Sequence, residues 1–96
     1  MGITVRGMVL PSWGGKSRAV RVLIQDELEE WWLREKVTTK LLYEPDREGI
    51  KRPSIYLSDR MAAAVQEGDM VKLEIEARDT KRGRNLKLVS ISKFPD

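Results

Sequence analysis

The sequence predicts a mainly β fold, a small β-barrel of five to six strands with two short helices. Three observations favour it. Residues 71–77 alternate apolar with charged side chains, which is typical of a strand that buries one face. Residues 3–10 and 18–24 also alternate and flank the glycine-rich segment 11–17, so we expect them to form a hairpin. The last third of the chain, 54–92, reads as strand, helix, Gly-Asp turn and two strands joined by a basic loop, an order found in few small barrels.

A first helix is expected over 27–36, after this hairpin. Asp26 is predicted to cap it, with Glu29 three residues later completing a capping pair, and the acidic first turn suits the helix dipole. The helical spacing places four side chains along one stripe, namely Leu28, Trp31, Trp32 and Glu35.

A second helix is expected over 60–66. Ser58 or Asp59 supplies its N-cap, and Gly68 follows as the glycine that ends it. The remaining elements are a strand over 37–44, a turn over 45–49, an extended segment over 50–57 and a last strand from 85, which has a bulge or two buried faces near Val89.

The composition excludes several kinds of chemistry. Cysteine and histidine are both absent, so the chain has no disulfide framework, no thiolate or imidazole metal ligand and no imidazole base. The carboxylates of Asp26, Asp59 and Asp69 are better explained by two helix starts and a turn than by a metal cluster. No glycine motif for nucleotide phosphates occurs. We therefore expect no enzyme activity, no catalytic residue, no cofactor and no metal.

The length and hydropathy of the chain bound its organisation. Its 96 residues are enough for one domain with one modest core. No apolar run is long enough to span a bilayer, and the first residues lack a signal-peptide pattern. A cytoplasmic protein without membrane contact is expected.

Basic side chains are concentrated towards the two ends of the chain, although the formal net charge is only +3. Residues 1–25 hold four basic and no acidic side chains, residues 26–36 hold five acidic and two basic, and residues 79–96 hold five basic and two acidic. If the fold gathers the two ends onto one edge, they form one basic patch, which is typical of a protein that binds a polyanion.

Two basic loops, 11–17 and 79–85, are central to this hypothesis. Their cations would neutralise phosphates, and aromatic side chains would stack on bases. The alternative is that both are ordinary solvated hairpin tips, where Lys and Arg cost little. Together with outward-pointing residues of neighbouring strands, the nucleic-acid-binding residues are predicted to be Trp13, Lys16, Arg18, Arg21, Tyr56, Lys81, Arg82, Arg84 and Lys87.

The adjacent pair Trp31 and Trp32 gives a second candidate surface. Neighbouring positions on a helix point about 100° apart, so one ring can enter the core while the other faces elsewhere. One interpretation is that one ring is core and the other lies under a loop. The other interpretation makes the outward ring a contact for a protein partner.

The segments around these loops resemble an OB-fold domain of the single-stranded-DNA-binding or replication protein A type. The similarity covers mainly 54–93, which follows the family's strand 3, helix, strand 4 and strand 5, while 5–10 and 20–26 look like strands 1 and 2. The resemblance implies one domain over 1–96 with a helical insertion at about 26–50. It also implies low-specificity binding of single-stranded DNA or RNA, with the two basic loops flanking the groove.

Two other interpretations remain open. The Glu-Gly-Asp segment at 67–69 and a faint internal echo at a spacing of 33–34 residues are similar to AbrB-type swapped-hairpin or cradle-loop barrels, which implies an obligate homodimer on duplex DNA. Alternatively, the chain is a small non-catalytic subunit of a ribonucleoprotein or polymerase assembly, docked through the tryptophan-bearing helix.

Overall fold

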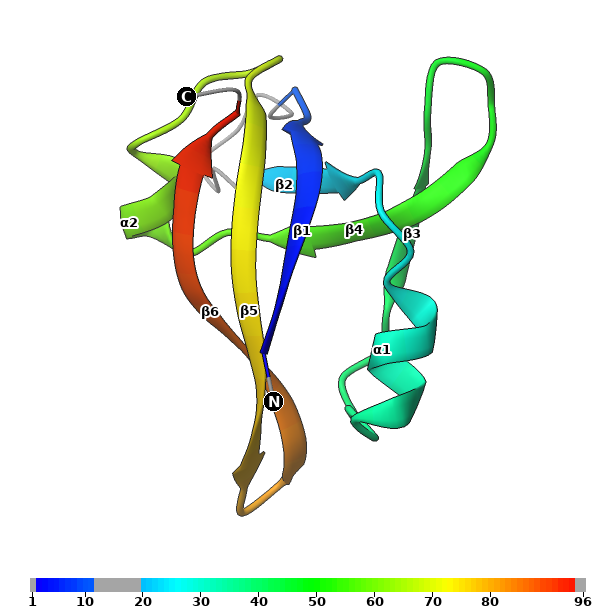
Figure 1. Ribbon diagram of the computed structural model, residues 1–96. Coiled ribbons are helices and arrows are strands. Elements are labelled where there is room, and N and C mark those ends of the chain that lie inside the picture. Colours follow the sequence, from blue (N-terminus) through cyan, green and yellow to red (C-terminus); the bar gives the residue numbers. More distant parts are fainter. Residues whose placement is uncertain (1, 12–19, 95–96) are drawn as a thin grey trace.

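The computed structural model describes residues 2–11 and 20–94. It confirms a mainly β fold with six strands and two short helices (Figure 1). The strands are β1 (Gly2–Val9), β2 (Arg21–Ile24), β3 (Leu42–Pro45), β4 (Lys51–Tyr56), β5 (Met70–Thr80) and β6 (Gly83–Lys93), and the helices are α1 (Glu29–Arg34) and α2 (Asp59–Ala62).

All six strands belong to one antiparallel sheet in the order β3-β4-β2-β1-β5-β6. The pairing of β1 with β2 confirms the expected hairpin. The expected barrel is not closed, because β3 and β6 are the two edges of this sheet. The reason lies in residues 37–41, which were expected to belong to a strand: their backbone reaches β6 only where the N–H of Thr38 donates to the carbonyl of Arg84 at 2.8 Å.

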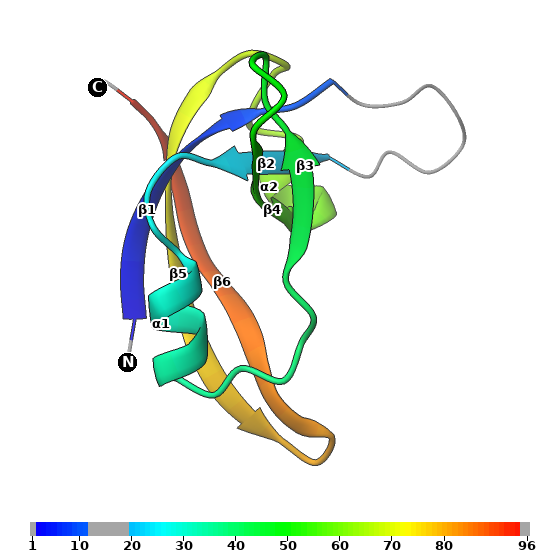
Figure 2. The ribbon, with the colours of Figure 1, turned by 90° about the vertical axis from the view of Figure 1, so that its right-hand side faces the viewer.

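The sheet bends sharply at β1. Residues 2–8 of β1 pair with β5, while residues 7–9 pair with β2, which runs across the long strands in Figures 1 and 2. Gly7 lies at this double pairing. A Cβ atom there would be 2.5 Å from Val22 Cγ1 and 2.6 Å from the carbonyl oxygen of Leu23, so only glycine lets β1 lie this close to β2.

One face of the sheet forms the core. The alternation of 71–77 is confirmed, since Val71, Leu73, Ile75 and Ala77 are buried. The expected irregularity in the last strand is a bulge: Ser90 pairs with Glu74 and Leu88 with Ile75, which leaves Val89 unpaired. The core is completed by side chains from the hairpin, α1 and β4, namely Val5, Val9, Val22, Ile24, Leu28, Trp31, Trp32, Ile55 and Leu57.

The helix α1 begins later than expected, and its predicted cap is wrong. Leu28 is the N-cap and makes no side-chain cap hydrogen bond. The carboxylate of Asp26 instead accepts hydrogen bonds from Arg6, through the backbone N–H at 2.8 Å and the guanidinium Nη2 at 2.8 Å. The carboxylate of Asp26 therefore binds Arg6, which is distant in the sequence, and does not cap the helix as the local pattern predicted.

The helix α2 begins as expected and ends early. Ser58 is its N-cap, and the Ser58 hydroxyl accepts a hydrogen bond from the N–H of Met61 at 3.4 Å. The helix stops at Ala62 and not at 66, so Gly68 does not end it. Gly68, with φ of 86°, lies in a turn that is closed by the Asp69 N–H and the Gln66 carbonyl.

Candidate nucleic-acid interface

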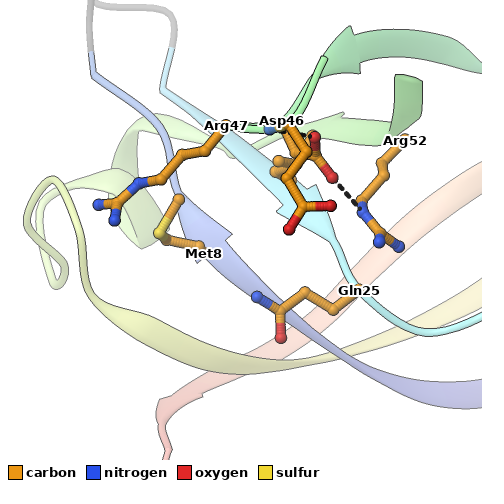
Figure 3. Close-up of a pocket in the computed structure, with 7 residues that line it drawn as sticks. Met8, Gln25, Asp46, Arg47 and Arg52 are labelled. Carbon is orange, nitrogen blue, oxygen red and sulfur yellow. Dashed lines mark hydrogen bonds and ion pairs between the residues drawn. The ribbon is translucent and has the colours of Figure 1, made fainter. Parts of the chain in front are cut away.

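A groove crosses the outer face of the sheet, the face opposite the core (Figure 3). The side chains of Met8 on β1 and Leu23 on β2 lie opposite each other in the ladder and share this face. The turn between β3 and β4 forms the facing wall, and the hollow has a volume of about 440 Å³. We call it the outer groove; it is lined by Met8, Leu23, Gln25, Asp46, Arg47, Glu48 and Arg52.

Asp46 shapes the wall of the outer groove. Its carboxylate accepts hydrogen bonds from the N–H groups of Glu48 and Ile50, each at 2.9 Å, and from Nε of Arg52 at 2.9 Å. The hydrogen bond from Arg52 is the main reason why the pKa of Asp46 lies below its ordinary value. Gly49 completes the turn with φ of 81°. The negative charge of Asp46 is therefore already compensated inside the turn.

Arg47 is the cation that this turn leaves available. Its side chain is exposed and, in the described part of the chain, makes no ion pair or hydrogen bond. Figure 3 shows it extending past Met8 over the groove, while Gln25, the residue after β2, faces the groove. The site thus combines a small apolar floor, an amide, an unpaired guanidinium and the exposed carboxylate of Glu48.

The groove continues towards the first basic loop. A neighbouring hollow of about 300 Å³ shares Met8, Leu23 and Arg47 with it and is also lined by Leu10 and Pro11. Pro11 is the first residue of that loop, and the next described residue is Val20. The predicted site residues Trp13, Lys16 and Arg18 lie outside the described residues.

The prediction for Arg21 is wrong. It points to the outer face, as expected, but only 11% of its side chain is exposed, and its guanidinium forms an ion pair with Glu44 of β3. An insertion strand therefore covers the cation that would have contacted phosphate.

The turn between β5 and β6 presents two of the predicted cations. Lys81 and Arg82 are exposed and make no ion pair within the described residues. The Thr80 hydroxyl holds the turn by donating to the Gly83 carbonyl at 2.8 Å and accepting from the Arg82 N–H at 3.2 Å.

Arg84 is not available in the way that was predicted. Its guanidinium bonds the carboxylate of Asp79 at 3.0 Å and that of Glu35 at 3.1 Å, and its Nε donates to the backbone carbonyl of Glu35. These bonds, with Asp79 the largest contributor, raise the pKa of Arg84. Arg84 thus joins α1 to the β5–β6 hairpin, a structural role.

The described residues that flank the two basic loops lie far apart. The end of β1 lies at the start of β5, because Val9 exchanges backbone hydrogen bonds with Gly68 and Asp69. Lys81 and Arg82 follow the other end of β5, about 30 Å away at strand rise. Figures 1 and 2 both place the end of β1 and the β5–β6 turn at opposite ends of the molecule.

Of the two interpretations of the tryptophan pair, the first is confirmed: one ring is core and the other lies under a loop, so neither ring is an outward contact. Trp31 and Trp32 are 3% and 7% exposed and pack edge to face with centroids 6.3 Å apart. The indole N–H of Trp32 donates to the Thr39 carbonyl at 2.9 Å, so a loop covers this ring. The exposed apolar residue of α1 is Leu33, at 77%.

The last two predicted residues lie elsewhere. Tyr56, at the end of β4, is 48% exposed and lines a second groove of about 430 Å³ between β4 and β6. Lys87 is half-buried on β6, between two leucines that line the same groove. We call it the seam groove; its main apolar lining is Trp32, Leu42, Ile55, Tyr56, Leu86 and Leu88.

Sequence reasoning missed the outer groove. The turn over 45–49 was predicted, and an Asp followed three residues later by Gly is a sequence signal for its hydrogen bonding. Nothing local indicates that this turn lies beside Met8 and Leu23, because that placement depends on the pairing of β4 with β2.

Comparison with known proteins assigns no family. No protein-family model, no curated protein and no solved structure matches the chain. Within the described residues, none of the helices has the length and apolar character needed to cross a membrane, and no three carboxylates are grouped so that they could hold a metal ion.

Proposed function

We propose that this chain binds single-stranded nucleic acid without catalysis, with the strand lying across the outer groove. The observation that carries the proposal is the outer groove itself: it lies on the face of β1, β2 and β4 and presents the unpaired cation Arg47 over an apolar floor.

The order of elements supports this assignment. Leaving out the insertion 26–50, which holds α1 and β3, the chain runs β1, β2, β4, α2, β5, β6. This is the order implied by the resemblance to OB-fold domains, in which a partly open barrel binds oligonucleotides on the face of its second and third strands and on two flanking loops. The corresponding strands are β2 and β4, and the corresponding loops are the two basic ones.

The position of those loops fits a strand that crosses the molecule. The described residues next to them lie at the two ends of β5, and the outer groove adjoins the first of these ends, because Met8 pairs with Met70 at the start of β5. Arg47 would contact phosphate near the start of β5, and Lys81 with Arg82 near its other end. Phosphate contacts carry no sequence information directly, so sequence specificity is expected to be low.

Fluorescence anisotropy with matched single- and double-stranded oligonucleotides tests the proposal. We expect the single strand to bind more tightly, and Arg47→Ala to weaken its binding. Arg34→Ala is the control, since Arg34 is an equally exposed cation on α1 without an ion pair in the described residues. Preference for the duplex by a stable dimer would overturn the proposal in favour of the duplex-binding regulator.

A further inference from the structure

The seam groove goes beyond the proposed function, because the open edge of β6 and the end of β4 beyond its pairing with β3 line it. Its lining comes from residues 54–58 on one side and from Leu86 and Leu88 of β6 on the other. It occupies the place where a closed barrel would have a further pairing.

The edge of β6 presents free backbone groups. The carbonyl of Arg84 accepts a hydrogen bond from Thr38 and therefore points away from β5. Backbone direction alternates along a strand, so the N–H and C=O groups of Leu86 and Leu88 also point away from β5. Among the described residues, no backbone partner meets them.

The end of β4 presents the opposing edge. The N–H of Leu57 donates to the Val20 carbonyl, towards β2, so the backbone of Tyr56 points the other way. That is the side on which Ser54 pairs with Leu42, the first residue of β3. Tyr56 lies beyond this pairing and has no strand partner on this side, while on the other side it pairs with Arg21 of β2. The hydroxyl of Ser54, which is 4% exposed and lines the seam groove, is buried without a hydrogen bond.

Residues 38 and 39 of the chain itself bond to the start of the open edge of β6. Thr38 bonds to Arg84 through its N–H at 2.8 Å and its hydroxyl at 3.1 Å, and Thr39 bonds to Asn85 at 3.2 Å. The chain then crosses to β4 as β3. The edge of β6 from Leu86 onward is left open above an apolar floor that includes Trp32 and Ile55.

We propose that the seam groove takes an extended peptide segment of a protein partner, added as a strand between β6 and β4. Such strand addition uses backbone hydrogen bonds for affinity and alternate side chains for specificity. Leu86 and Leu88 share the face of Ala77 and Ile75, so the segment's residues opposite them are apolar and face the core. The residue opposite Lys87 lies on the outer face and is acidic.

Charge distinguishes this partner from a second copy of the chain. Lys87 pairs in register with Glu76 of β5, but Glu76 is in ion-pair contact with Arg78. Lys87 makes no ion pair in the described residues and is therefore available to a carboxylate of the partner. A second copy joined through Leu86 and Leu88 would place the two Lys87 side chains directly opposite each other, which is destabilising.

Two peptides test the inference. Each is capped, about eight residues long, and alternates valine with either glutamate or lysine. Binding is measured by amide NMR and hydrogen exchange on the whole chain. We expect the glutamate peptide to slow exchange at Leu86 and Leu88, whose N–H groups face the groove, and to leave Lys87, already bonded to β5, unchanged.

A charge reversal gives the specificity control. The wild-type chain should prefer the glutamate peptide by at least about threefold, the effect of one cross-strand ion pair. Lys87→Glu should reverse this preference. Lys51→Glu makes the same change of charge at an exposed position of β4 and should leave the preference unchanged. Absence of saturable binding, protection outside β6 and β4, self-association through β6, or displacement of the peptide by an oligonucleotide would each overturn the inference.

Discussion

Asp26 and Arg6 are joined by three hydrogen bonds that connect the end of the first hairpin to the middle of β1. The carboxylate accepts from the backbone N–H of Arg6 at 2.8 Å, from its Nη2 at 2.8 Å and from its Nε at 3.3 Å. These contacts fix the chain where it leaves the sheet towards α1. The pair is thus a structural clamp, and not a helix cap.

Asp26→Ala should lower stability through loss of this clamp. The substitution removes the carboxylate that accepts all three hydrogen bonds, so we expect the Tm to fall by about 4 °C or more. Glu27→Ala, next in the chain, is the control and should have little effect. Thermal unfolding by circular dichroism measures both, and equal effects would contradict the clamp.

The same pair predicts a pH dependence. The hydrogen bond from Arg6 is the largest cause holding the pKa of Asp26 below its ordinary value. The folded state therefore favours the carboxylate, and this stabilisation is present above about pH 4 and is lost as the pH falls through the lowered pKa. The difference in Tm between wild type and Asp26→Ala should narrow below about pH 4, and a constant difference would contradict it.

Gly7→Ala should be among the most damaging small substitutions. Its Cβ would meet Val22 Cγ1 at 2.5 Å and the backbone carbonyl oxygen of Leu23 at 2.6 Å, and this carbonyl cannot move away unless β2 itself shifts. We expect a loss of about 2 kcal/mol or more. Gly68→Ala is the comparison, since its Cβ meets nothing within 4 Å and only its φ of 86° is unfavourable. Urea unfolding should rank Gly7→Ala as the more destabilised variant.

Arg21 and Arg47 should have opposite effects on stability and binding. Arg21→Ala removes a largely buried ion pair with Glu44, so it should lower the Tm and leave oligonucleotide affinity unchanged once the chain is folded. Arg47→Ala removes an exposed cation, so it should lower affinity and leave the Tm unchanged. If Arg21→Ala lowered affinity and Arg47→Ala did not, the ligand would instead lie at Arg21 of β2.

Local signals predicted the elements that depend on neighbouring residues. The alternation of 71–77, the bulge at Val89 and the cap at Ser58 all follow from residues close in sequence. The alternation and the bulge indicate which face of a strand is buried, and the cap indicates which backbone N–H has a side-chain acceptor. No distant segment contacts these groups in a way that changes the outcome.

Predictions failed where a side chain that was assigned a local or solvent-exposed role contacts a residue distant in the sequence. Asp26 has the residue type and spacing of a cap, but strand pairing brings Arg6 to its carboxylate. Arg21 points outward as expected, but Glu44 of the insertion covers it. For the tryptophan pair, the sequence left two interpretations open. The path of residues 37–41 decides between them, because Thr39 covers the Trp32 ring beside the core ring of Trp31.

The salt dependence of single-strand binding tests the central claim most directly. Each phosphate contact contributes about 0.7 to the slope of log affinity against log salt concentration on single strands. Arg47→Ala should therefore reduce the slope by about that amount, while Arg34→Ala leaves it at the wild-type value. An unchanged slope for Arg47→Ala, or a single-strand affinity that does not depend on salt, would contradict the placement of the ligand in the outer groove.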